Sequence, residues 1–158
     1  MSSSLATYLN DHLAGSLAAL ELLEHHLTRH PGTEQETLTR LRQNIEEDQQ
    51  VLRQLLEELG GKESPMKKAA AWLTEKIGQV KLRFDDPGDG DLRWLEALEA
   101  LGLGIQGKLA LWRALAAVPS DLPQRRALDL SRLQQRALDQ FELVEGLRLQ
   151  AARAALAR

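Results

Sequence analysis

The chain contains no cysteine and few aromatic residues or prolines. The absence of cysteine excludes disulfides and thiol chemistry. Aromatic residues make up only 4% of the 158 residues. Because strands favour aromatic and β-branched residues, whereas Leu and Ala dominate here, this composition predicts helices and not a sheet. At this length the chain is expected to form one domain around a single core.

The sequence also lacks a surplus of positive charge and a long apolar run. Its 20 basic and 23 acidic residues give a formal net charge of −3, which argues against a nucleic-acid partner, because phosphate binding relies on a broad positive field. No stretch approaches the ~20 apolar residues of a membrane-spanning helix. The first residues, MSSSLATYLNDH, lack the basic and apolar regions of a signal peptide. We therefore expect a soluble, cytoplasmic protein with no membrane span.

Four long segments carry apolar residues at three- and four-residue steps, the helical period. The first ends at Pro31-Gly32, because proline cannot continue the backbone hydrogen bonding. The second begins near Thr33 and ends before Gly60-Gly61. In the fourth, Pro123 falls in the first turn, a position that proline favours. These signals predict helices at about 4–30, 34–59, 91–118 and 122–155.

A connection of about thirty residues separates the second and third of these helices. Antiparallel neighbours in a bundle are usually joined by about two to eight residues. Residues 66–80 of the connection are predicted to form a helix, which at 1.5 Å per residue covers ~23 Å, about the length of the bundle. Such a connection carries the chain back along the bundle, as in ferritin-like folds. We therefore predict an all-α, ferritin-like four-helix bundle over residues 1–158, with a long crossover connection that carries an extra short helix.

Four segments of the chain carry a resemblance to a known group of proteins. They are YLNDHLAGSLAALELLEH (8–25), IEEDQQVL (45–52), KKAAAWLTEKIG (67–78) and GIQGKLALWRAL (104–115). These segments resemble small, uncharacterised bacterial ferritin-like proteins, and the similarity covers most of the chain. The resemblance implies a four-helix bundle. It also implies the historical function of the ferritin-like superfamily, which depends on a di-iron centre.

The usual ligands of a di-iron bundle are missing from this sequence. Such a centre takes a Glu from each of two helices and a Glu-x-x-His pair from each of the other two. No Glu-x-x-His pair occurs, and all four histidines, His12, His25, His26 and His30, fall in the first predicted helix. We therefore expect no bound metal, no cofactor and no catalytic residue. The expected function is that of a non-catalytic bundle that acts through another protein or as a homo-oligomer.

An alternative is a metal site of unusual, carboxylate-rich composition. At a rise of 1.5 Å per residue along the bundle axis, several carboxylates and a histidine from different helices are expected at similar heights near one end of the bundle. Carboxylates together with a histidine can hold iron or manganese. The chain would then be a metalloprotein for oxidation or metal binding. The other interpretation is that these residues are helix formers on solvent-exposed faces. The candidate ligands are Glu21, Glu24, His25, Glu47, Asp48, Glu96, Glu99, Glu142 and Glu145.

Asp48 interrupts the apolar stripe of the second helix. A buried carboxylate is costly unless it is paired or hydrogen bonded, so we expect a partner on the first helix or a basic group on the fourth. A buried polar contact of this kind fixes the register of the helices, as polar core residues do in coiled coils. The alternative interpretation is that Asp48 belongs to a metal or proton site, either active or a remnant. The candidate partners are Ser16, His12, Gln106 and Arg136. The predicted structural polar core is Asp48, His12 and Ser16.

Three glycines of the third helix, Gly102, Gly104 and Gly107, form the string G-x-G-x-x-G. The dinucleotide fingerprint of this form needs a strand before it and a helix after it. No strand is predicted here, so we reject that interpretation. Each glycine costs about 1 kcal/mol relative to alanine in a helix, and close approach of another segment is the usual compensation. We therefore predict a notch that Trp72 of the connection fills or that serves as a ligand pocket.

Overall fold

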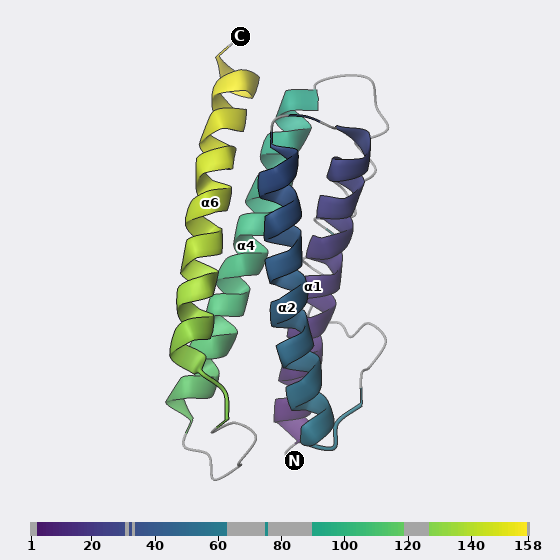
Figure 1. Ribbon diagram of the computed structural model, residues 1–158, viewed down its shortest axis with the longest axis vertical. Helices are drawn as coiled ribbons and strands as arrows, with labels where there is room; N and C mark the ends of the chain where they lie inside the picture. The colour runs from purple at the N-terminus through teal and green to yellow at the C-terminus, as the bar shows by residue number, and fades with distance from the viewer. Residues whose placement is uncertain are drawn as a thin grey trace.

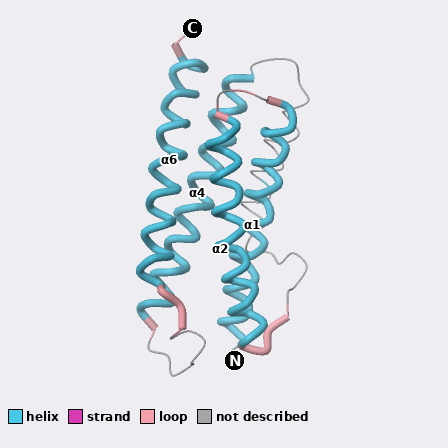
Figure 2. The backbone as a smooth tube through the Cα atoms, in the orientation of Figure 1, coloured by secondary structure: helices cyan, strands magenta, loops and turns pink. Residues whose placement is uncertain are grey.

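The protein is built from α-helices. The computed structural model describes residues 3–30, 32, 34–62, 75, 90–118 and 127–157. Within these residues lie four helices and no strand, so the predicted class, an all-α four-helix bundle, is confirmed (Figures 1 and 2). The first three of these helices begin and end within one residue of the positions predicted for them, 4–30, 34–59 and 91–118. The helices are α1 (Ser3–Arg29), α2 (Gln35–Glu58), α4 (Gly90–Ala117) and α6 (Leu130–Leu156).

The helices run up, down, down and up along the bundle, so α2 and α4 point in the same direction (Figure 1). The buried residues form two clusters that reflect this order. One joins the C-terminal halves of α1 and α6 with the N-terminal halves of α2 and α4. The other joins the four opposite halves. Residues 63–74 and 76–89, which connect α2 to α4 and contain most of the predicted helix at 66–80, lie outside the described part of the chain.

The fourth predicted helix was placed too early. It was expected from residue 122, but residues 127–129 are not helical and α6 begins at Leu130. Asp129 caps it, because its side chain accepts a hydrogen bond from the Arg132 backbone N–H at 2.9 Å. A cap of this kind contributes about 1 kcal/mol by satisfying an otherwise unpaired backbone donor. The segment around Pro123, on which the earlier start relied, lies outside the described residues.

The core consists mainly of leucine and alanine, and α4 packs most closely against α6. Gly102 lies at this interface. A methyl group added there would sit 3.7 Å from the Phe141 ring and 3.9 Å from Val144, which is ordinary van der Waals contact. Side chains of α6 therefore cover this part of the predicted glycine notch.

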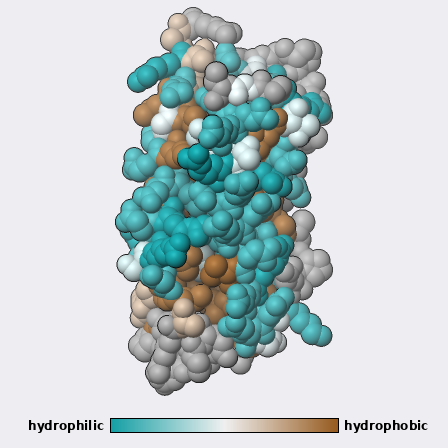
Figure 3. All heavy atoms as spheres, in the orientation of Figure 1, coloured by the Kyte–Doolittle hydropathy of each residue, from teal (hydrophilic) through white to brown (hydrophobic). Residues whose placement is uncertain are grey.

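One face of the bundle is mainly polar (Figure 3). Figure 3 shows a face dominated by hydrophilic side chains, with smaller apolar areas above and below its middle. This is the pattern of amphipathic helices that bury one face against each other. Among the described helices, none is both long enough and apolar enough to cross a bilayer.

Candidate functional site

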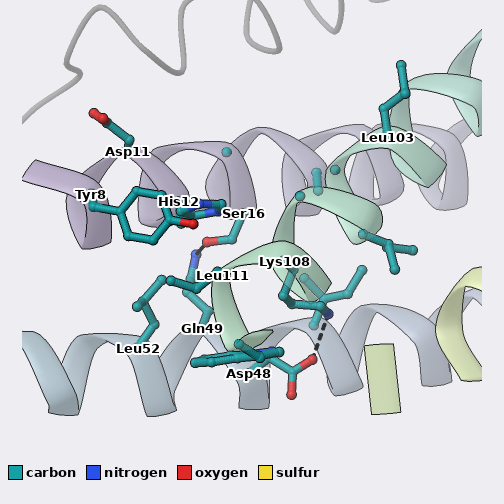
Figure 4. A pocket seen from close by; sticks show the side chains of 17 residues that line it. Tyr8, Asp11, His12, Ser16, Asp48, Gln49, Leu52, Leu103, Lys108 and Leu111 are labelled. Carbon is teal, nitrogen blue, oxygen red and sulfur yellow. Dashed lines mark hydrogen bonds and ion pairs between the residues drawn. The ribbon is translucent and has the colours of Figure 1, made fainter. Parts of the chain in front are cut away.

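A cavity of about 380 Å³ lies between α1, α2 and α4 (Figure 4). Its size falls in the lower part of the range of about 300–1,000 Å³ that is typical of ligand sites. Gly104 and Gly107 of α4 form part of its wall, and an added Cβ at Gly107 would meet no atom of the described chain within 4 Å. Two of the three glycines in the predicted notch therefore border a cavity. Trp72, the predicted filler, lies outside the described residues.

Asp48 of α2 is buried in the wall of this cavity and is only 2% exposed. Its Oδ2 accepts hydrogen bonds from Lys108 Nζ at 2.6 Å and from Gln140 Nε2 at 3.0 Å. Its Oδ1 lies 3.3 Å from an Arg136 guanidinium nitrogen. The predicted burial of Asp48 is confirmed, but its hydrogen-bond donors are Lys108 of α4 and Gln140 of α6, and the basic group of the fourth helix, Arg136, lies at ion-pair distance. Gln106, another candidate partner, is exposed.

Lys108 of α4 is the centre of this polar network and was not among the residues predicted from the sequence. Its ammonium donates to Asp48 Oδ2 and to Gln140 Oε1. Burial lowers the pKa of Lys108, and the charge and hydrogen bond of Asp48 partly oppose that shift. One signal could have revealed it. Lys108 lies one helical turn after Gly104 and therefore shares a face with the glycine notch.

Ser16 of α1 does not partner Asp48 as predicted. Its Oγ accepts a hydrogen bond from Gln49 Nε2 at 2.9 Å and donates to the Leu13 carbonyl at 2.7 Å. The contact with Ser16 that was expected of Asp48 is made by Gln49, the next residue of α2. The Gln49 side chain faces α1 more directly than that of Asp48. Ser16 lies on the cavity wall, joined to α2 through this amide (Figure 4).

His12 lies on the α1 side of the cavity together with Tyr8 and Asp11. Its ring packs edge-on against Tyr8, with the two centroids 4.7 Å apart. Burial lowers the pKa of His12, and the charge of Asp11 acts in the opposite direction. The Asp11 carboxylate points away from Lys108 (Figure 4). The predicted core residues therefore have separate partners: Asp48 contacts Lys108 and Gln140, Ser16 contacts Gln49, and His12 contacts the Tyr8 ring.

The alternative metal ligands do not gather into one site. Among the described residues, no group of three or more His, Asp or Glu side chains is placed to hold a metal ion. Glu21 and Glu142 are exposed, and His25 and Glu96 are half-buried. Four others pair with arginines, and Asp48 pairs with Lys108. The arginine pairs are Glu24–Arg42 at 2.9 Å, Glu47–Arg136 at 2.9 Å, Glu99–Arg148 at 3.7 Å and Glu145–Arg148 at 2.7 Å.

Comparisons with protein-family models, curated proteins and solved structures find no match to this chain. The site is therefore interpreted from its own geometry. Most of the cavity wall is apolar; it also carries the carboxylates of Asp11 and Asp48 and the ammonium of Lys108, which is held in place by Asp48 and Gln140. An apolar cavity with a few fixed polar groups is typical of a site that binds a small molecule. The apolar wall includes Ala19, Ile45, Leu52, Leu103, Ile105, Leu111 and Trp112.

A second buried titratable group lies near the C-terminal end of α1. The His26 ring stacks on Trp94 of α4, with centroids 3.4 Å apart and planes 13° from parallel. Its Nδ1 is buried and has no hydrogen-bond partner within the described chain. The pKa of His26 is lowered to about 4, chiefly by burial and further by the neighbouring His30 and His25. In the folded protein this histidine is therefore neutral above about pH 4.

Proposed function

We propose that the chain is a ferritin-like bundle that acts by binding and not by catalysis, and that the cavity between α1, α2 and α4 receives a small, largely apolar molecule. The cavity of about 380 Å³ with its apolar wall is the observation that carries this proposal. Ligand sites of this kind use apolar surface for affinity and a few polar groups for orientation. Lys108, fixed by two partners, is such a polar group.

The ferritin-like assignment is part of the proposal and is supported by the directions of the helices. In a bundle whose second and third long helices run the same way, the chain between them has to return along the bundle. Ferritin-like metal sites use side chains that project inward from facing helices. Here Asp48, Lys108 and Gln140 project inward from α2, α4 and α6. The positive charge beside the buried Asp48 carboxylate comes from the Lys108 ammonium. This arrangement fits a bundle that does not hold a di-iron centre.

Filling the cavity is expected to abolish binding. Leu at Gly107 projects into the cavity, because an added Cβ meets no neighbour there. The neutral fluorophore N-phenyl-1-naphthylamine is expected to bind the natural chain saturably at one site, and Gly107→Leu is expected to remove that binding. Both observations come from one fluorescence titration.

Gly146→Leu is the matched control for this experiment. Gly146 is an exposed helical glycine of α6 that does not border the cavity, and an added Cβ there also meets no neighbour. Both substitutions are expected to raise helix stability by up to about 1 kcal/mol, so a loss of binding confined to Gly107→Leu reports the cavity. Equal binding by the two variants, or no saturable binding to the natural chain, contradicts the proposal.

Self-association through α6 is a second candidate function. Leu138, Leu149 and Leu156 are exposed, and at 100° per residue they lie within about 20° of one another around the helix. Glu142 and Glu145 lie between them on nearly the same face. Three exposed leucines on one face of a helix offer apolar contacts to a partner helix. The expected partner is a second copy of the chain.

A dimer that forms through this stripe is expected to dissociate when Leu149 is replaced by lysine. Sedimentation velocity at micromolar concentration should give a dimer for the natural chain and a monomer for Leu149→Lys. Leu103→Lys is the control, because Leu103 is equally exposed but lies on α4. A monomeric natural chain removes this second candidate and leaves the cavity proposal unaffected.

A further inference from the structure

The two cations of the polar network, Lys108 and Arg136, share one deeply buried anion, Asp48. The side chains of Lys108 and Arg136 are 14% and 24% exposed, and the Asp48 side chain between them is 2% exposed. The other anion of the network, Glu47, pairs with Arg136 from a side chain that is 65% exposed, where water screens its charge. Asp48 is therefore shared by two cations, and Glu47 is a second partner of Arg136 only. Lys108 has no carboxylate of its own among the described residues, so an acceptor on a ligand can pair with it.

The hydrogen-bond donors at the same place are also incompletely used. An ammonium has three N–H donors, and those of Lys108 have two acceptors within the described chain, Asp48 and Gln140. Trp112 follows Lys108 by one helical turn, and both border the cavity. The buried indole N–H of Trp112 also has no acceptor among the described residues. Buried donors without an acceptor are costly, so the site favours a ligand that brings acceptor oxygens.

The other titratable groups on the cavity wall, Tyr8, Asp11 and His12, belong to α1. The Asp11 carboxylate has a buried Oδ1 without a hydrogen-bond partner among the described residues, and it points away from Lys108 (Figure 4). Burial lowers the pKa of His12, which favours its neutral form. Beyond these groups the wall is mostly apolar, with leucines and isoleucines from α2 and α4.

We infer that the molecule bound in the cavity is an apolar carboxylic acid, whose carboxylate accepts a hydrogen bond from Lys108 and whose hydrocarbon body lies against the apolar wall. This inference rests on the proposed function and specifies the ligand class. Lys108 then has a carboxylate on either side, Asp48 from the protein and one from the ligand. The ligand's carboxylate gives Lys108 a partner that it does not share with Arg136.

Three probes with the same ten-carbon chain test the inference: decanoate, decanol and decylamine, each titrated by calorimetry at pH 7.5 below its aggregation concentration. Decanoate is expected to bind about ten-fold or more tightly than decanol, since a carboxylate accepts a stronger, charge-assisted hydrogen bond from the Lys108 ammonium than a hydroxyl does. Decylamine is expected to bind most weakly. Lys108→Met should remove the preference for decanoate over decanol. Lys62→Met, at an exposed lysine outside the cavity, should change neither affinity.

A second variant guards against loss of the fold in Lys108→Met. Asp48→Asn combined with Lys108→Gln replaces the ion pair by two neutral amides of similar size, and it should bind decanoate and decanol about equally. Decanol or decylamine binding the natural chain as tightly as decanoate overturns the inference. If only N-phenyl-1-naphthylamine binds, the inferred ligand class, an apolar carboxylic acid, is wrong and the proposed function stands. If none of the four molecules binds, both are wrong.

Discussion

Replacing Lys108 by methionine is expected to lower the free energy of unfolding by about 3 kcal/mol at pH 7. The substitution keeps most of the hydrocarbon chain but removes the ammonium that lies 2.6 Å from Asp48 Oδ2. It leaves a carboxylate that is 2% exposed with Gln140 and Arg136 as its remaining partners. Breaking a buried pair on one side costs about 3–5 kcal/mol, and Arg136 keeps the loss at the lower end. Urea unfolding followed by circular dichroism measures the change.

The double variant Asp48→Leu with Lys108→Met is the control for this prediction. Removing both charges and packing apolar side chains in their place is often neutral or stabilising, so the double variant is expected to lie within about 1 kcal/mol of the natural chain. Asp48→Ala alone should lose about 1–3 kcal/mol, because it leaves buried donors unsatisfied. A single Lys108→Met variant within a few tenths of a kcal/mol of the natural chain shows that water reaches Asp48 and that the network does not stabilise the bundle.

The stability of the bundle is expected to fall by up to about 3 kcal/mol between pH 6.5 and pH 4 because of His26. Its pKa is about 4 in the folded protein and about 6.5 in an unfolded chain. Between these values the unfolded chain binds a proton that the folded protein does not, so acidification favours unfolding. The contribution of the neutral stacked ring is complete above pH 6.5 and is lost as the pH falls toward 4. Urea unfolding at several pH values measures this dependence.

His26→Phe isolates this effect from the titration of carboxylates. Phenylalanine keeps an aromatic ring against Trp94 and cannot take up a proton, so the variant should lack about 3 kcal/mol of the pH dependence that the natural chain shows. His30→Gln, at an exposed position, should retain most of that dependence. Identical pH profiles for His26→Phe and the natural chain show that His26 is protonated in the folded state as readily as in the unfolded one.

The helices were largely predictable from the sequence because their signals are local. The Pro31-Gly32 break and the Gly60-Gly61 stop place the ends of α1 and α2 within one residue of the observed positions. The start of α6 was not predictable in the same way. Pro123 and Asp129 both suit the first turns of a helix, and periodicity alone does not decide between two starts that precede the same apolar stripe.

The candidate site was predictable in part. Asp48 stood out because a carboxylate interrupted an apolar stripe, and its burial follows from that position. Lys108 did not stand out, since its backbone lies beside the stripe and its long side chain reaches the buried carboxylate. The proposed carboxylate layer failed for a different reason. A rise of 1.5 Å per residue gives the height of a side chain and not the side of the helix from which it projects.

A nitrogen–proton NMR titration with N-phenyl-1-naphthylamine tests the ligand cavity most directly. Gly15, Gly104 and Gly107 border the cavity, whereas Gly146 lies on α6 away from it. The backbone amide signals of the three cavity glycines are expected to shift together and to saturate with one dissociation constant, while the Gly146 signal stays in place. Shifts that are absent, that do not saturate, or that appear at Gly146 and not at the cavity glycines contradict a binding site between α1, α2 and α4.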